Sequence, residues 1–349
     1  MLCLLFLVAL GAFLFWRYKR EQLTVENIRS KAVLVTGCDS GFGKTFALKC
    51  LNEGMPVFAA CLTEKGKGEL VDSTRLLPGR LHAFVMDVTN EESVKAGKKF
   101  VEEKCQAYKG LYGLLNNAGI ASNTSLDDWL TVSDYRRVAE VNTFGVILVT
   151  QTFKDLIKKS RGRIVTTSSI CGRLGIGGLG PYTVSKFAVE GYCDVIRNEL
   201  ANFGVKVSVI EPGFFRTPMT DSKRITAQLD SLWANATPET RAEYGEKYFK
   251  FCKFLKQQKL IKRSVSVQTE AAELLDKFSS SHPEQVSDIY FHAISAVHPR
   301  GRYQVGWDAH LLFIPLSFLP AEIQTFLITS VHRLAGFPLP AVLEEDRIC

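Results

Sequence analysis

The sequence has no Cys-x-x-Cys pair, and its histidines show no spacing typical of metal ligands. Its nine cysteines are scattered over 349 residues and are odd in number. Disulfide frameworks and zinc sites use paired or closely spaced cysteines. The pattern therefore predicts free, buried thiols and no metal site.

Long runs of lysine and arginine are also missing, and basic residues do not interleave with aromatic ones as on a nucleic-acid-binding face. The formal net charge of +7 is only mildly basic for this length. We therefore expect no nucleic-acid partner. With 46% hydrophobic and 23% charged residues, the chain has enough apolar material for a large globular core.

The first sixteen residues contain no charge, and Arg17, Lys19 and Arg20 follow directly. This stretch is slightly shorter than the roughly 20 residues that span a bilayer. It lacks a preceding basic region and a small-residue cleavage site, which favours an uncleaved anchor over a cleaved secretory signal. We predict a membrane anchor over residues 1–20. Its basic flank predicts a cytosolic main domain.

A short apolar strand at residues 31–36 leads into a glycine-rich turn, and residues 44–52 have the pattern of a helix. In this context, glycines let the backbone approach a pyrophosphate, and the helix N-terminus presents N–H groups to it. The candidate cofactor-binding residues in this segment are Thr36, Gly37, Asp39, Ser40, Gly41, Phe42 and Gly43.

The second strand ends at Cys61, without the acidic residue that often binds the adenosine ribose there. NAD is still favoured over NADP, because residues 37–43 contain no basic side chain and Asp39 would repel a ribose phosphate. Lys44 and Lys65 argue in the opposite direction.

Two further strands, at residues 81–86 and 111–115, are each followed by candidate cofactor contacts. Asp87 and Val88 follow the first, and Asn116-Asn117-Ala118-Gly119 follows the second. Small residues let the chain pass beside a cofactor. For the two asparagines, stabilisation of neighbouring loops is the favoured role and cofactor contact is the second.

A long helix is predicted over residues 132–159, with Asn142 in its apolar centre. A polar amide on the inner face of a helix costs stability unless it is hydrogen-bonded. Two interpretations stay open for Asn142: a satisfied core asparagine, and a link in a proton path to Lys186.

The stretch that carries the predicted chemistry runs from a strand at residues 164–167 to a helix that opens with Tyr182 and Lys186. Four residues apart is one helical turn, so the phenol and the ammonium share a face. A nearby cation favours the phenolate, so Lys186 should lower the pKa of Tyr182 from about 10 and let it exchange a proton. Ser169, at the strand end, can hydrogen-bond a substrate oxygen.

A strand at residues 205–210 is followed by Pro212-Gly213, a turn at the sheet edge where ligands bind in open α/β sheets. Strands that alternate with helices in this way predict a parallel sheet with right-handed crossovers.

These motifs occur in the order and spacing of the short-chain dehydrogenase/reductase family, which the sequence resembles from about residue 31 to residue 220. The segments TGCDSGFG, AACLTEKG and LYGLLNNAGI resemble more narrowly its membrane-bound retinol and hydroxysteroid dehydrogenase branch. The resemblance implies anchoring in the endoplasmic reticulum, a preference for NAD, and the two-helix packing between subunits that is common in the family.

The resemblance also implies a role for each matching residue. Tyr182 would be the catalytic base, and Lys186 would lower its pKa and hold the nicotinamide ribose. Ser169 would orient the substrate hydroxyl, and Asn142 would hold a water of the proton relay. The remaining positions would contact the cofactor: Asp87 at the adenine, Asn116 and Gly119 at the adenosine ribose, and Pro212, Gly213 and Thr217 at the nicotinamide.

Substrate choice is expected to depend on the region after Thr217. Residues 243–263 have an apolar stripe, and three interpretations stay open: a packed helix, a lid over the substrate cleft, and a membrane-surface helix. Residues 311–331 are strongly apolar, but two prolines and a glutamate make them a poor transmembrane span. Core packing and a flap that touches the bilayer both fit this second segment.

We therefore expect a single Rossmann-like, doubly wound α/β domain with a parallel sheet. Residues 1–20 would be the anchor, 30–220 the NAD(P)-binding catalytic core, and 221–349 a helical substrate-binding region with the last strand and an apolar C-terminal segment. The expected activity is NAD-dependent oxidation of a lipophilic alcohol, such as retinol or a hydroxysteroid, at the endoplasmic reticulum membrane.

Two alternatives to this activity stay open. One is an NADPH-dependent reductase of lipid or xenobiotic carbonyls. The other is a non-catalytic dinucleotide-binding membrane protein. The second is disfavoured because binding alone would not require four residues to occur together: Asn142, Ser169, Tyr182 and Lys186.

Overall fold

A single parallel sheet forms the centre of the fold. The computed structural model describes residues 2–108, 110–121, 125–215, 222–258, 282–334 and 336–345. The sheet has seven strands in the order β3-β2-β1-β4-β5-β6-β7. They are β1 (Ala32–Thr36), β2 (Val57–Cys61), β3 (Leu81–Val85), β4 (Leu111–Asn116), β5 (Arg163–Thr167), β6 (Lys206–Pro212) and β7 (Arg302–Val305).

The strand order reverses at β1, which pairs with β2 on one side and with β4 on the other. At such a switch point the chain leaves neighbouring strands in opposite directions, and a crevice for a ligand opens at their carboxyl ends. This topology confirms the predicted doubly wound α/β fold. The six strands placed from the sequence are all present, with ends shifted by at most two residues.

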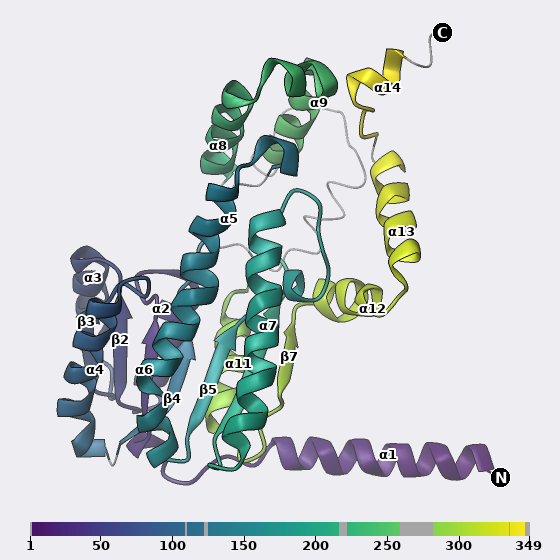
Figure 1. Ribbon diagram of the computed structural model, residues 1–349. Coiled ribbons are helices and arrows are strands. Elements are labelled where there is room, and N and C mark those ends of the chain that lie inside the picture. Colours follow the sequence, from purple (N-terminus) through teal and green to yellow (C-terminus); the bar gives the residue numbers. More distant parts are fainter. Residues whose placement is uncertain are drawn as a thin grey trace.

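Helices cover both faces of the sheet (Figure 1). One apolar core lies under α4 (Glu91–Cys105), α6 (Gly145–Lys159) and α7 (Gly180–Ala201). The other lies under α2 (Gly41–Asn52), α3 (Glu64–Thr74) and α11 (Glu284–Ser295). Alternate residues of β1 enter the two cores, because successive side chains of a strand point to opposite faces. This two-sided burial explains why the strands are almost uniformly apolar.

The long helix predicted over residues 132–159 is present in three parts. These are α5 (Val132–Ala139), one π-helical turn (Glu140–Phe144) and α6. A π-helical turn inside an α-helix is rare and frequently marks a functional position. Asn142 lies in this turn.

Two helices, α8 (Ser222–Asn235) and α9 (Pro238–Gln258), lie beyond the carboxyl ends of the strands, at the top of Figure 1. Trp233 of α8 stacks on Phe249 of α9 with 4.7 Å between the ring centroids. Trp129 closes the cluster at 5.0 Å from Trp233. The pair therefore has an aromatic core of its own.

The helix predicted over residues 243–263 corresponds to α9, which begins five residues earlier, at Pro238. Gly245 has a φ of 76° and kinks the helix near its middle. Tyr244 and Tyr248 of the predicted stripe pack against the aromatic cluster, as the packed-helix interpretation requires. Residues 259–263 of the prediction lie outside the described residues.

The apolar segment at residues 311–331 is divided between a π-helical turn (Ala309–Phe313), α12 (Ile314–Ser317) and α13 (Ala321–Leu334). A short helix, α14 (Ala341–Glu345), follows. Several large apolar side chains of α13 are exposed, among them Phe326 at 67%. Figure 1 shows α13 standing apart from the sheet.

The first helix, α1 (Leu2–Glu21), projects away from the foot of the sheet in Figure 1. Glu21, the last residue of α1, is hydrogen-bonded to the domain: Arg300 Nε donates to Glu21 Oε1 at 2.9 Å. The hydrogen bond from Arg300, with a second from Arg17, holds the pKa of Glu21 down to about 2. Among the described residues, no helix combines the length and the apolar character needed to cross a membrane.

Candidate active site

The glycine-rich turn after β1 is packed tightly against the end of β4. Gly37 has a φ of 72°, and a Cβ at this position would lie 2.8 Å from Ala118 Cα. A Cβ on Gly43 would lie 2.4 Å from Gly37 O. These two glycines therefore permit close backbone packing inside the protein. Gly41, with a φ of 60°, has nothing within 4 Å of its Cβ position and faces open space.

Thr36 and Asn117 join the two strands at the switch point. Thr36 Oγ1 accepts hydrogen bonds from the backbone N–H groups of Asn117 and Ala118, both at 3.0 Å. Asn117 Nδ2 donates to Thr36 O at 2.9 Å and to Gly37 O at 3.2 Å. The structural role favoured for this asparagine is confirmed.

Asn116 is 2% exposed and donates through Nδ2 to Thr150 Oγ1 of α6 at 2.8 Å. Its side chain is therefore used within the fold, which again matches the favoured structural role. Gly119 brings the chain close to the π-helical turn before α6, because a Cβ there would lie 3.2 Å from Asn142 Oδ1.

Asp39 leaves the glycine-rich turn and reaches the carboxyl end of β2. Its Oδ2 accepts from Leu62 N at 2.7 Å, and its Oδ1 accepts from Thr63 N at 3.0 Å. The negative charge missing from the end of β2 in the sequence is therefore supplied in space by Asp39. Gly66 lets α3 pack over this carboxylate, because a Cβ there would lie 2.3 Å from Asp39 Oδ1.

The start of α2 suits the pyrophosphate of a dinucleotide. Ser40 is the N-cap residue, and its side chain makes no capping hydrogen bond. The first N–H groups of the helix therefore have no side-chain cap, and they lie beside the open space at Gly41. Phe42 packs edge-on against Phe215 at 5.7 Å between centroids, which fixes the turn against the loop after β6.

Asp87 and Val88 follow β3 at the same edge of the sheet. Asp87 Oδ1 accepts from Thr89 N at 2.9 Å and from Thr89 Oγ1 at 2.8 Å, so the turn is held by its own side chain. Val88 is buried against Gly145, where a Cβ would lie 2.9 Å from Val88 Cγ2. The structure thus places both residues beside the carboxyl ends of the strands.

Ser169, Tyr182 and Lys186 are brought together by β5 and the first turns of α7. Ser169 is 7% exposed, and its Oγ accepts from Cys171 N at 3.2 Å. Lys186 is 4% exposed, and its Nζ donates to Thr167 O at 2.8 Å. The same Nζ lies 5.4 Å from the centroid of the Tyr182 ring, so the cation and the phenol share a face as predicted.

The predicted lowering of the Tyr182 pKa is wrong for the protein chain alone. Burial, with a smaller contribution from Cys171, raises the pKa of Tyr182 well above its usual value, and a hydrogen bond with Ser169 acts in the opposite direction. Burial lowers the pKa of Lys186 itself to about 8. Desolvation outweighs the cation in this pair.

Asn142 is fully buried and clamps the loop that follows β4. Its Oδ1 accepts from Ile120 N at 2.8 Å, and its Nδ2 donates to Ile120 O at 3.0 Å. Nδ2 also lies 3.2 Å from Ser185 Oγ, which donates to Tyr182 O at 2.7 Å. The amide is a satisfied core group that links this loop to the turn carrying Tyr182, and its place in a proton path stays a prediction.

The Pro212-Gly213 turn is held by a residue that the sequence did not single out. Asp308 is fully buried, and its Oδ2 accepts from Phe214 N at 2.6 Å. A Cβ on Gly213 would lie 2.0 Å from Asp308 Oδ1, so only glycine fits there. Thr217, the third residue predicted at the nicotinamide, lies outside the described residues.

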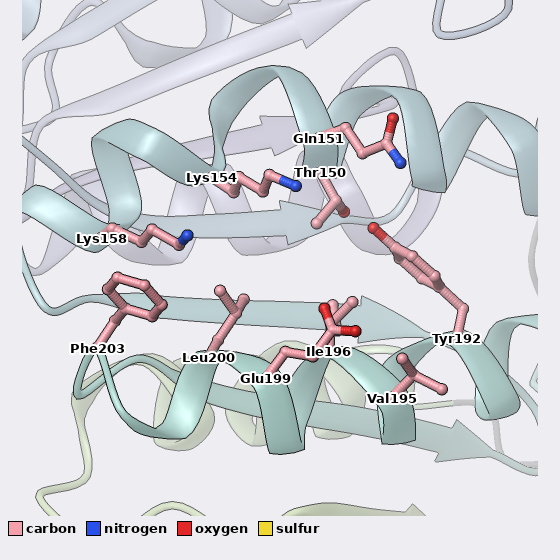
Figure 2. A pocket seen from close by; sticks show the side chains of 10 residues that line it. All are labelled: Thr150, Gln151, Lys154, Lys158, Tyr192, Val195, Ile196, Glu199, Leu200 and Phe203. Atoms are coloured by element: carbon pink, nitrogen blue, oxygen red, sulfur yellow. The ribbon is translucent and has the colours of Figure 1, made fainter.

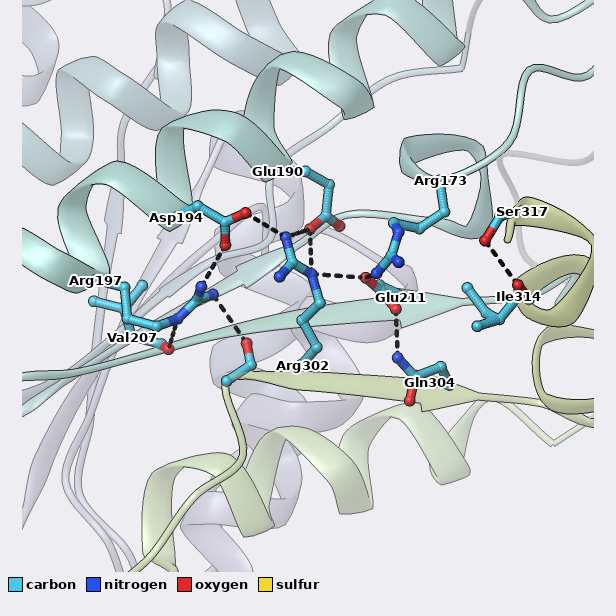
Figure 3. Close-up of polar contacts among 11 residues, drawn as sticks. Arg173, Glu190, Asp194, Arg197, Val207, Glu211, Arg302, Gln304, Ile314 and Ser317 are labelled. Carbon is cyan, nitrogen blue, oxygen red and sulfur yellow. Dashed lines mark hydrogen bonds and ion pairs between the residues drawn. The ribbon is translucent and has the colours of Figure 1, made fainter. Parts of the chain in front are cut away.

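Figure 3 shows a second group that the sequence did not reveal, a cluster of charges behind the site. Arg302 of β7 binds Glu190 Oε2 at 3.0 Å, Asp194 Oδ2 at 2.7 Å and Glu211 Oε1 at 3.2 Å. Arg173, which follows the Ser169 loop, also reaches Glu211 Oε1 at 3.2 Å. The one sequence signal was Glu190, an acid that follows Lys186 by one helical turn.

A pocket of about 400 Å³ lies between α6 and α7, on the outer surface of the domain (Figure 2). Lys154 and Lys158 line it from α6, and Tyr192 and Phe203 line it from the side of α7. None of the residues predicted for catalysis or cofactor binding lines it.

Comparisons with known proteins agree with this geometry. The model of the short chain dehydrogenase family matches residues 31–228. The chain is 38% identical over 334 residues to 17-beta-hydroxysteroid dehydrogenase type 6 of Bos taurus, covering 96% of this chain and 97% of that one. It is 41% identical over 328 residues to retinol dehydrogenase 16 of Mus musculus, covering 94% and 96%.

Solved structures with low sequence identity share the fold. A short-chain dehydrogenase/reductase from Burkholderia phymatum, determined in complex with NAD, superposes with a TM-score of 0.63 at 22% identity, covering 87% of this chain and 97% of that one. A short-chain dehydrogenase from Streptomyces avermitilis gives 0.61 at 23% identity, covering 86% and 97%. The chain therefore belongs to the short-chain dehydrogenase/reductase family of nicotinamide-dependent oxidoreductases.

Proposed function

We propose that this protein uses NAD to oxidise a lipophilic alcohol, such as a retinoid or a hydroxysteroid, to the corresponding carbonyl compound. The observation that carries the proposal is the convergence of Ser169, Tyr182 and Lys186 beside the crevice at the carboxyl ends of the strands. The relatives named above are a hydroxysteroid dehydrogenase and a retinol dehydrogenase, which supports this substrate class.

In the proposed reaction, Ser169 holds the substrate hydroxyl and Tyr182 removes its proton. Tyr182 packs against the turn that Ser169 begins, which supports this assignment, because a substrate oxygen that meets both side chains can be held and deprotonated together. When bound, NAD supplies the hydride acceptor and a positively charged ring. We propose that the ammonium of Lys186 binds the ribose of the cofactor and stabilises the phenolate of Tyr182.

The preference for NAD over NADP rests on Asp39. Its carboxylate is fixed at the end of β2, where a ribose phosphate would meet a like charge. The uncapped start of α2 would hold the pyrophosphate through backbone N–H groups. Asp87 and Val88 would border the adenine, and Pro212 and Gly213 would border the nicotinamide.

We further propose that the protein acts at the endoplasmic reticulum membrane, with its catalytic domain in the cytosol. The apolar residues of α1 and the basic residues at its end support attachment, and exposed apolar side chains on α13 provide a second surface suited to lipid. A homodimer through α6 and α7 is also proposed, since Val195 and Phe203 are about half exposed beside the pocket of Figure 2.

Tyr182→Phe tests the proposed chemistry, with Tyr192→Phe as the matched control. Both changes remove one phenolic hydroxyl from α7, but Tyr192 lines the outer pocket. We expect Tyr182→Phe to reduce turnover at least about a hundredfold while the dissociation constant for NAD stays within a few-fold. Tyr192→Phe should retain both the turnover and the NAD affinity of the wild type. Undiminished turnover in Tyr182→Phe would contradict the mechanism.

A further inference from the structure

Lys186 is a buried cation whose charge is difficult to maintain. It is 4% exposed, and burial lowers its pKa to about 8, while the charge of Glu190 acts in the opposite direction. A lysine that must remain an ammonium at physiological pH is therefore close to losing its proton.

Glu190 lies one helical turn after Lys186 and is 5% exposed. Both residues pack against the turn that follows Ser169. A Cβ built on Gly172 would lie 2.9 Å from Glu190 Cγ and 3.1 Å from Lys186 O. The carboxylate is thus enclosed between this turn and the helix that carries the catalytic lysine.

Arg302 fixes the orientation of Glu190. Arg302 Nε donates to Glu190 Oε2 at 3.1 Å, and Arg302 Nη2 lies 3.0 Å from the same oxygen, as Figure 3 shows. The second oxygen, Glu190 Oε1, is buried and has no hydrogen-bond partner among the described residues. Arg302 therefore compensates the carboxylate at Oε2 only, and the field of the buried Oε1 acts on the cation one turn away.

We propose that Glu190, held in place by Arg302, is a positioning residue that keeps Lys186 protonated in the active site. This inference rests on the role proposed above for Lys186. It also assigns the cluster of charges around Arg302 a function beyond joining β6, β7 and α7.

The other titratable groups that face Lys186 cannot replace Glu190. Burial raises the pKa of the Cys171 thiol to about 11 and that of the Cys193 thiol to about 12, so both are neutral at physiological pH. Tyr182, on the same helix, is also neutral there in the chain alone because burial raises its pKa. Glu190 is the remaining anionic group in the electrostatic surroundings of Lys186.

The groups that face Glu190 determine when it is ionised. Burial, followed by the charge of Glu211 on β6, raises the pKa of Glu190 to about 7, whereas Ser168, which follows β5, and Arg302 on β7 act in the opposite direction. Glu190 therefore carries its charge above neutral pH, which is the range in which Lys186 would otherwise lose its proton.

The test compares Glu190→Gln with Asp194→Asn. Both variants remove one carboxylate from Arg302, because Arg302 Nη2 donates to Asp194 Oδ2 at 2.7 Å. Asp194 lies a further turn from Lys186, and its side chain is 44% exposed, so solvent screens its charge. The rate would be followed from about pH 6 to pH 10, together with the dissociation constant for NADH by fluorescence.

We expect the pKa of Lys186 to fall by about one unit in Glu190→Gln, which is the low end of the shift that the loss of a nearby opposite charge produces. The alkaline decline in rate should then begin about one pH unit earlier, with a five- to tenfold lower rate near pH 8.5 than in Asp194→Asn. NADH binding should weaken over the same range. Superimposable profiles of the two variants would overturn the proposal.

Glu190→Asp is a second variant in case Glu190→Gln does not fold. Its side chain is shorter by one methylene, so the carboxylate lies farther from Lys186. The alkaline decline in rate should therefore shift in the same direction by a smaller amount. An unshifted decline in the folded variant would overturn the proposal. Failure of the proposed chemistry is distinguishable, because it would be seen as turnover retained by Tyr182→Phe. The NADH profile reports on Lys186 in either case.

Discussion

Replacing Gly43 with alanine would place a methyl group where the glycine-rich turn, α2 and the end of β4 meet. The new Cβ would lie 2.4 Å from Gly37 O and 2.4 Å from Asn117 Nδ2. These two atoms are themselves hydrogen-bonded at 3.2 Å, and one belongs to the backbone. A side-chain rotation alone therefore cannot relieve the clash, and the turn must move away from the helix.

The cost has two parts. Overpacking of a tight site costs about 1–3 kcal/mol, and disturbing the hydrogen bond of Asn117 adds about 1 kcal/mol. A loss of about 2–4 kcal/mol corresponds to a fall of roughly 3–6 °C in the melting temperature of a domain of this size. Because the turn moves where the pyrophosphate is proposed to bind, we expect NAD affinity to weaken by about tenfold or more, that is, by at least about 1.4 kcal/mol.

Gly68→Ala is the matched control. Gly68 lies within α3 and is exposed, and its Cβ position has nothing within 4 Å. The same chemical change should stabilise the protein by up to about 1 kcal/mol there, since glycine is a poor helix former. Thermal unfolding and titration with NAD would be measured for both variants. A Gly43→Ala protein that melts and binds NAD like the wild type would refute the packing argument.

Two further predictions concern buried acids. Glu21→Gln should cost about 2 kcal/mol at pH 7, because it removes charge-assisted hydrogen bonds with Arg300. Since folding lowers the pKa of Glu21 from 4.5 to about 2, its contribution is present above about pH 4.5 and disappears as the pH falls through 2, so unfolding curves of variant and wild type should converge in acid. A difference that persists unchanged at low pH would count against this. Asp308→Asn should cost about 1–3 kcal/mol, because Phe214 N loses its carboxylate acceptor, and it should weaken cofactor binding by loosening the turn at Gly213. Unchanged unfolding and affinity would show that the carboxylate does not hold this turn.

The sequence predicted the parts of the fold and site that depend on local spacing. The apolar strands, the glycine-rich turn and the Tyr182-x3-Lys186 pair are each encoded within a few neighbouring residues, and each is where it was expected. The parallel sheet followed from the alternation of strands and helices.

Features built from distant segments could not be predicted in this way. Asp308 meets Gly213 across 95 positions, and Arg302 meets Glu190 across 112. Neither contact leaves a pattern in one sequence. The raised pKa of Tyr182 has the same origin, because the spacing to Lys186 is visible in the sequence but the burial that outweighs it is not.

For Asp39, one part of its role could be predicted from the sequence and the other part could not. Its position in the turn suggested repulsion of a ribose phosphate, whereas its bonds to Leu62 and Thr63 at the end of β2 became visible only in the fold. The kink in α9 is a third example, since Gly245 in an amphipathic stretch carries no sign that its φ will be 76°.

The central claim is tested most directly by initial rates with a panel of retinols, hydroxysteroids and their carbonyl forms, measured with NAD and NADP in parallel. Purified, detergent-solubilised protein would be used, with Tyr182→Phe as the blank. The account predicts NAD-dependent oxidation of one lipophilic class and no activity in the blank. Reduction that depends on NADPH would contradict the role given to Asp39, and tight NAD binding without turnover of any substrate would contradict the proposed chemistry.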